Sequence, residues 1–100
     1  MQIGLAGEGT LECLQLLRLL PHRRLVCLAS RGAKIVIDKL FIHADKSEKD
    51  YTHELSGYNY LLQSKVLTPK LVSHGLLAQG SLAQAGYYVI YEYIANTLSL

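Results

Sequence analysis

The stretch that most constrains the fold is residues 35–41, Ile-Val-Ile-Asp-Lys-Leu-Phe. Its β-branched and aromatic residues favour a buried strand, and Lys39 is the one cation among these apolar neighbours. Successive side chains of a strand point to opposite faces, so Asp38 is predicted to point away from Lys39. Because a buried ammonium group needs a partner of opposite charge, we expect a carboxylate on the element that packs against the face of the strand that bears Lys39.

Residues 51–62 supply that carboxylate. Their large side chains recur at spacings of four, three and four along the chain: Tyr51, Leu55, Tyr58 and Leu62. This spacing is typical of one face of a helix, and at 100° per residue Glu54 falls within the same face. Burying a carboxylate alone is costly. The spacing therefore predicts that Glu54 pairs with Lys39, fifteen residues earlier.

Length and composition indicate one globular domain. The chain has 100 residues, of which half are hydrophobic and 18% are charged, which excludes a disordered or fibrous protein. The net charge of +2 is too small to argue for a nucleic-acid partner, and none is expected. There is no uncharged apolar run of 18 residues and no basic start leading into an apolar core, so we expect neither a membrane span nor a secretory signal.

Turn residues divide the chain into strands and one helix. The glycine-rich residues 1–12 are predicted to be a flexible N-terminal segment, and residues 13–100 the folded domain. Five strands are predicted at 13–20, 25–29, 34–42, 70–77 and 87–94, the first two joined by a turn at 21–24. Ser47 and Asp50 resemble a helix capping box. The expected fold is α+β, a five-stranded antiparallel sheet with one packing helix, in the order β-β-β-α-β-β.

The two cysteines do not suggest a disulfide. If residues 21–24 form a hairpin turn, Cys27 lies opposite residue 18 and Cys13 is about five residues further along. That separation is roughly 16 Å at the rise of a strand, which is beyond the reach of a disulfide. We therefore predict two free thiols in a reducing compartment.

This order of elements resembles the small N-terminal lobe of the protein-kinase-like fold. The resemblance rests on four motifs: residues 36–39 (Val-Ile-Asp-Lys), 53–62 (beginning His-Glu), 68–71 (Thr-Pro-Lys-Leu) and 89–94 (Val-Ile-Tyr-Glu-Tyr-Ile). In chain order, they match the strand that carries the phosphate-anchoring lysine, the helix whose glutamate pairs with that lysine, and the proline that precedes the fourth strand of the lobe. The last motif matches the fifth strand and the hinge that follows it. Within this fold, the sequence most resembles bacterial lipopolysaccharide core kinases and RIO-like small-molecule kinases. This closer resemblance rests on residues 18–26, Gly32 and residues 39–41.

The resemblance implies an ATP-binding site. Lys39 would contact the α- and β-phosphates, and Glu54 would fix its side chain; these two are the implied catalytic residues. The implied nucleotide contacts also include the backbone at Glu92 and Ile94, which would bond the adenine edge. Val26 and Ile37 would cover the ring, and Tyr91 would limit the back of the pocket.

The chain departs from the kinase pattern in two places. Residues 21–24 (Pro-His-Arg-Arg) replace a glycine-rich loop, so Arg23 and Arg24 are predicted to contact phosphate oxygens instead. The catalytic loop and the Mg²⁺-binding residues of the family belong to a large lobe that would follow Leu100. The 100 residues alone are therefore expected to bind nucleotide weakly and not to transfer phosphate. The acceptor would be a sugar or another small molecule, and the compartment the cytoplasm or the inner face of its membrane.

A second interpretation is a non-catalytic α+β interaction module that uses the same fold. Its partner surface would be the hinge side, through which a homodimer could form, and the residues expected there are Tyr93, Ile94, Leu98 and Leu100. The histidines at 22, 53 and 74 lack the spacing of metal ligands, so no metal site is predicted.

Overall fold

A computed structural model of the chain describes residues 2–65, 67–78 and 86–93. In this part of the chain it has six strands and one helix, in the order β1 (Gln2–Leu5), β2 (Gly9–Leu20), β3 (Arg24–Arg31), β4 (Lys34–Phe41), α1 (Ser47–Gln63), β5 (Leu71–Leu76) and β6 (Tyr87–Glu92). All neighbouring strands are antiparallel, in the order β1-β2-β3-β4-β6-β5. The predicted α+β class is confirmed, and the predicted count of five strands is corrected to six.

The additional strand lies in the glycine-rich N-terminal segment. Residues 2–5 pair with residues 9–12, so residues 2–12 form a hairpin and not the predicted flexible segment. Gly7 and Gly9 have φ values of 79° and 89°, which glycine adopts without strain, and they form the turn. Ile3 and Leu5 are buried in the core. Their burial explains why this short strand is held in place.

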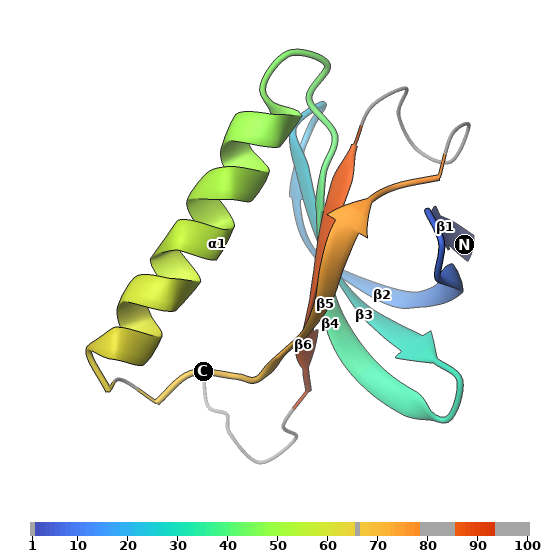
Figure 1. Ribbon diagram of the computed structural model, residues 1–100. Coiled ribbons are helices and arrows are strands. Elements are labelled where there is room, and N and C mark those ends of the chain that lie inside the picture. Colours follow the sequence, from blue (N-terminus) through green and yellow to red (C-terminus); the bar gives the residue numbers. More distant parts are fainter. Residues whose placement is uncertain (1, 66, 79–85, 94–100) are drawn as a thin grey trace.

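The sheet is strongly curved, and its two faces bury different residues (Figure 1). The concave face encloses the larger core, whose members are Ile3, Leu5, Leu11, Cys27, Ala29, Val36, Leu40, Leu77, Tyr88 and Ile90. At one end the two edges of the sheet meet, because Leu5 bridges to Leu77 and the Ala6 amide donates to the Leu76 carbonyl oxygen. The result is a half-barrel with a packed interior.

The helix lies against the other face of the sheet, over β4 and β6 (Figure 1). Its apolar residues Tyr51, Leu55 and Tyr58 pack against a second core of Phe41, Val89 and Tyr91. The predicted helical face is therefore confirmed for these three residues, whereas Leu62, the fourth predicted member, is 48% exposed and does not belong to this core. No helix among the described residues combines the length and the apolar character that crossing a membrane requires.

The start of α1 differs from the predicted capping box, in which Ser47 is the N-cap residue. Lys46 occupies the N-cap position without a side-chain hydrogen bond, and Ser47 is the first helical residue. The backbone N–H groups of Asp45 and Lys46 instead donate to His43 Nδ1, each at 3.1 Å. The Asp50 carboxylate binds Arg23 and is therefore not available as a cap.

The two cysteines are free, but they lie closer together than the sequence suggests. Two irregularities in the β2–β3 pairing, at residues 13–15 and 16–18, place Cys13 opposite Ala29 on the face that Cys27 shares. Burial, the charge of the Asp38 carboxylate and a hydrogen bond with the Cys13 thiol raise the pKa of Cys27. The predicted separation of the two residues assumed a regular ladder and is corrected here.

Gly86 occupies a position that has no room for a side chain. A Cβ there would lie 2.7 Å from Leu77 Cδ1 and 3.1 Å from the Phe41 carbonyl oxygen. We expect Gly86→Ala to lower the free energy of unfolding by about 1–3 kcal/mol, measured by urea denaturation. The control is Gly57→Ala in α1, where a Cβ has nothing within 4 Å and alanine should be neutral or stabilising. Equal midpoints for Gly86→Ala and the wild type would contradict this packing.

Candidate functional site

Lys39 and Glu54 form the ion pair that the sequence predicts. The Lys39 Nζ atom lies 2.9 Å from Glu54 Oε2 and donates a hydrogen bond to it. Lys39 is in the second half of β4, and Glu54 lies near the middle of α1 on the side that faces the sheet. The side chains are 32% and 18% exposed, respectively, so the pair is half-buried and Lys39 can still reach a ligand.

Tyr91 on β6 is the third member of this cluster. Its hydroxyl donates to the same oxygen of Glu54, and the Lys39 Nζ atom lies 5.5 Å from the centre of its ring. Burial and the hydrogen bond to Glu54 raise the pKa of Tyr91, so the phenol stays a donor at neutral pH. Glu54 Oε2 thus receives hydrogen bonds from two strands, which fixes the carboxylate in place.

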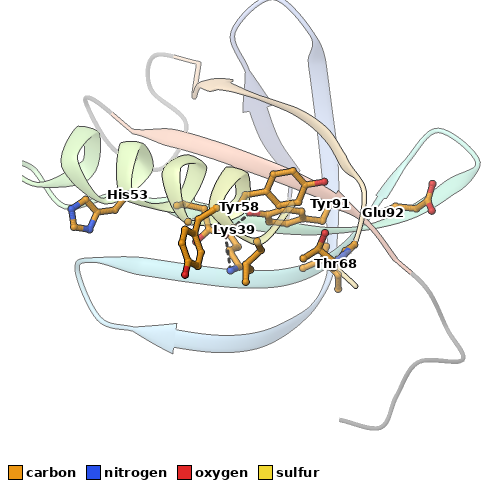
Figure 2. A pocket seen from close by; sticks show the side chains of 12 residues that line it. Lys39, His53, Tyr58, Thr68, Tyr91 and Glu92 are labelled. Atoms are coloured by element: carbon orange, nitrogen blue, oxygen red, sulfur yellow. Dashed lines mark hydrogen bonds and ion pairs between the residues drawn. The ribbon is translucent and has the colours of Figure 1, made fainter. Parts of the chain in front are cut away.

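A cavity of about 570 Å³ opens beside the cluster. This volume is in the range of small-molecule and cofactor sites. Figure 2 shows Lys39, Tyr58 and Tyr91 close together, with His53 and Glu92 at opposite ends of the site. The cavity is lined by Ile37, Lys39, His53, Glu54, Gly57, Tyr58, Tyr60, Leu61, Thr68, Pro69, Tyr91 and Glu92. An apolar wall with one ammonium group and fixed acceptors at its edge suits a ligand with a flat apolar part and an anionic part.

Five of the residues predicted for the site line this cavity: Lys39, Glu54, Ile37, Tyr91 and Glu92. Val26 does not line it, but it pairs directly with Lys39 across β3 and β4 and so lies on the same face of the sheet. Ile94 falls outside the described residues. The sequence motifs therefore converge on one region of the molecule.

The two arginines of the β2–β3 turn do not line the cavity. Arg23 donates to Asp50 through Nε at 3.0 Å and through one terminal nitrogen at 2.9 Å. These hydrogen bonds lower the pKa of Asp50 and hold the turn against the start of α1. The Arg24 guanidinium lies 5.3 Å from the centre of the Phe41 ring, and its buried Nε has no hydrogen-bond partner within the described residues.

Sequence reasoning missed several residues that line the cavity, chiefly His53, Tyr58 and Thr68. Tyr58 was predicted only as a packing residue, yet its hydroxyl also accepts a hydrogen bond from the Leu71 amide at 2.9 Å. This bond ties α1 to the start of β5 and shapes the cavity wall. Leucine would pack equally well at this position. The presence of tyrosine is therefore the sequence signal that could have indicated a hydrogen-bonding role for the side chain.

Asp38 points to the opposite face from Lys39, as strand alternation predicts. It is fully buried in the half-barrel, and both of its carboxyl oxygens lack a hydrogen-bond partner within the described part of the chain. Burial raises the pKa of Asp38 to about 8. In the same part of the chain, no three His, Cys, Asp or Glu side chains are grouped in a way that could hold a metal ion.

The chemistry that this arrangement permits is the recognition of an anion next to an apolar surface. Lys39 supplies the charge, Glu54 and Tyr91 hold its position, and Ile37 and Pro69 supply apolar walls. No protein-family model, curated protein or solved structure matches the chain.

Proposed function

We propose that this chain is the ATP-binding lobe of a kinase-like phosphotransferase whose acceptor is a sugar or another small molecule. The observation that supports this most is the Lys39–Glu54 pair, 2.9 Å apart at the edge of a 570 Å³ cavity. A lysine held by a carboxylate on a neighbouring helix can contact phosphate oxygens without losing its orientation. The resemblance of the four sequence motifs to the kinase-like small lobe points to the same ligand.

The proposed roles of Lys39, Ile37, Tyr91 and Glu92 follow their positions around the cavity, and those of Val26 and Ile94 follow the resemblance to the kinase-like small lobe. Lys39 binds the α- and β-phosphates, and Ile37 with Val26 covers the base. The backbone at Glu92 and Ile94 bonds the adenine edge. Tyr91 limits the depth of the pocket and, through its hydrogen bond, orients Glu54.

Phosphoryl transfer needs more than this lobe. In the proteins that the chain resembles, a large lobe supplies the catalytic loop and the residues that hold Mg²⁺, which neutralises the phosphate charge. The residues of this chain bind and orient the nucleotide, and Lys39 stabilises charge on its phosphates. Nucleotide binding by these 100 residues is therefore the property to measure first.

Calorimetric titration of ATP into the protein is the corresponding experiment. We expect saturable one-to-one binding, and we expect Glu54→Gln to weaken it about tenfold because Lys39 loses a charged partner. Glu48→Gln, an exposed change on the same helix with the same loss of charge, should bind like the wild type. Absence of saturable binding by the wild type would refute the proposal, and equal affinities for Glu54→Gln and Glu48→Gln would refute the role of the pair.

A second candidate function is supported by exposed apolar side chains near the cavity. Tyr60 and Leu67 are 69% and 97% exposed, and Tyr93 at the predicted hinge is 42% exposed. Such a surface suits a protein partner, including a second copy of the chain. Ile94, Leu98 and Leu100, which the sequence places on the same hinge side, lie outside the described residues. A concentration-dependent dimer in sedimentation analysis, together with no ATP binding, would favour this interaction module.

A further inference from the structure

A second cavity lies on the concave side of the sheet and does not include Lys39. Its volume is about 400 Å³, which is in the range of small-molecule sites. It is lined by Glu8, Arg31, Lys34, Ile35, Val36, Val72, Ser73 and Glu92. Glu92 pairs with Val36 of the concave core, so its side chain points to this side of the sheet, and Figure 2 shows it directed away from Lys39.

Arg31 and Glu8 form a fixed and neutral wall of this cavity. The Arg31 guanidinium donates to Ser73 Oγ at 3.0 Å and forms an ion pair with one carboxylate oxygen of Glu8. The other oxygen of Glu8 accepts a hydrogen bond from the hydroxyl of Tyr88, which is buried in the core. The charges of Arg31 and Glu8 therefore balance each other, and both side chains are held in place.

The other two charged groups of the lining have no partner. Neither the Lys34 ammonium group nor the Glu92 carboxylate makes a hydrogen bond or an ion pair with a described residue. Lys34 lies directly opposite Arg31, and like charges in that arrangement repel. Glu92 lies opposite Val36, two residues beyond Lys34 on β4, so the Cα atoms of the two unpaired residues are diagonal neighbours about 7–8 Å apart.

The surface between these two charges is apolar and accessible. The side chains of Ile35 and Val72 are exposed, and Val36 closes the floor beneath them. The cavity thus offers a separate cation and anion on either side of an apolar surface. A ligand that carries one charge would pair with only one of the two groups and leave the other unpaired.

We propose that this second cavity binds the zwitterion of an α-amino acid with an apolar side chain. The ammonium group of the ligand pairs with Glu92, its carboxylate pairs with Lys34, and its side chain lies on Val36 and Val72. The wall of Arg31 and Glu8 limits the length of the ligand. The site lies on the opposite side of the sheet from Lys39, so this inference goes beyond the proposed function and does not depend on it.

Calorimetric titration of three small molecules tests this inference: L-leucine, 4-methylpentanoate and 3-methylbutylamine. The second compound is leucine without its ammonium group, and the third is leucine without its carboxylate. We expect leucine to bind saturably. Each of the other two compounds should bind about tenfold more weakly, because one of the two charged contacts is lost.

Two variants assign the two charges. Glu92→Gln should weaken the binding of leucine and 3-methylbutylamine about tenfold and leave 4-methylpentanoate unchanged, because only the first two carry an ammonium group. Lys34→Gln should weaken leucine and 4-methylpentanoate about tenfold and leave the amine unchanged. The controls Glu48→Gln and Lys70→Gln remove the same charges from exposed residues that line neither cavity, and they should bind all three compounds like the wild type.

The possible outcomes decide this inference separately from the proposed function. If leucine does not bind to the wild type, the inference is refuted. Equal affinities of the wild type for leucine and the two analogues would show that neither charge is recognised, and would also refute it. If Glu92→Gln and Lys34→Gln weaken leucine no more than their controls do, the ligand binds elsewhere and the inference fails. If leucine binds through Lys34 and Glu92 but ATP does not bind, the amino-acid site stands and the nucleotide function fails.

Discussion

Replacing Asp38 with asparagine is expected to stabilise the protein by several kcal/mol at pH 8 and to remove most of the dependence of stability on pH between 4 and 8. Asp38 is fully buried on the concave face of the sheet, and neither carboxyl oxygen has a hydrogen-bond partner among the described residues. Burial raises the pKa of Asp38 from 3.8 to about 8. The charged form is therefore strongly disfavoured in the folded state.

The sign of the pH dependence follows from this difference. Between pH 4 and pH 8 the unfolded chain has released the Asp38 proton, whereas the folded protein retains it because its pKa is about 8. The folded state binds more protons over this range, so the free energy of unfolding falls as the pH rises. Below pH 4 both states are protonated, and the contribution of Asp38 to the slope disappears.

Urea denaturation at pH 4.5, 6 and 8 measures this effect. The wild type should lose stability steadily as the pH rises, and Asp38→Asn should lose much less. Asp45→Asn removes the same charge from an exposed loop residue and should follow the wild type. Two results would contradict this interpretation of Asp38 as a buried carboxylic acid without a hydrogen-bond partner. One is a wild-type stability that does not change over this pH range, and the other is the same change of stability with pH for Asp38→Asn as for the wild type.

Asp38 and Lys39 illustrate how much of the site could be predicted. Strand alternation places them on opposite faces, and the position of Glu54 on the apolar face of the helix requires a cation nearby. Both predictions follow from local periodicity, which a single sequence contains. The lack of a hydrogen-bond partner for the Asp38 carboxyl group among the described residues could not be predicted. It depends on which residues β2, β3 and β6 place around this side chain.

Longer-range partners account for the rest of the differences. Arg23 was predicted to be free for phosphate, but it pairs with Asp50, 27 residues away, and nothing in the local sequence indicates this pairing. Ile3 and Leu5 form too short an apolar pattern to predict a strand, although their burial defines β1.

The second large effect is expected for Lys39→Met. Methionine keeps most of the length and apolar character of the lysine side chain but removes the charged donor. Glu54 retains its hydrogen bond from Tyr91, so the helix should stay attached and the circular dichroism spectrum should not change. Contacts with two phosphate groups would be lost, each a charge-assisted hydrogen bond, which together correspond to roughly a hundredfold in affinity.

Lys49→Met is the matched control, because Lys49 is an exposed lysine of α1 that does not line the cavity. Comparing the two variants separates the particular position of Lys39 from the simple loss of one positive charge. Thermal unfolding of both proteins shows whether any loss of binding reflects a loss of fold.

The most direct measurement is therefore the dissociation constant of ATP for the wild type, Lys39→Met and Lys49→Met at one salt concentration. We expect saturable binding by the wild type and Lys49→Met, and a roughly hundredfold loss of affinity for a folded Lys39→Met protein. Equal affinity of Lys39→Met and the wild type for ATP would contradict it.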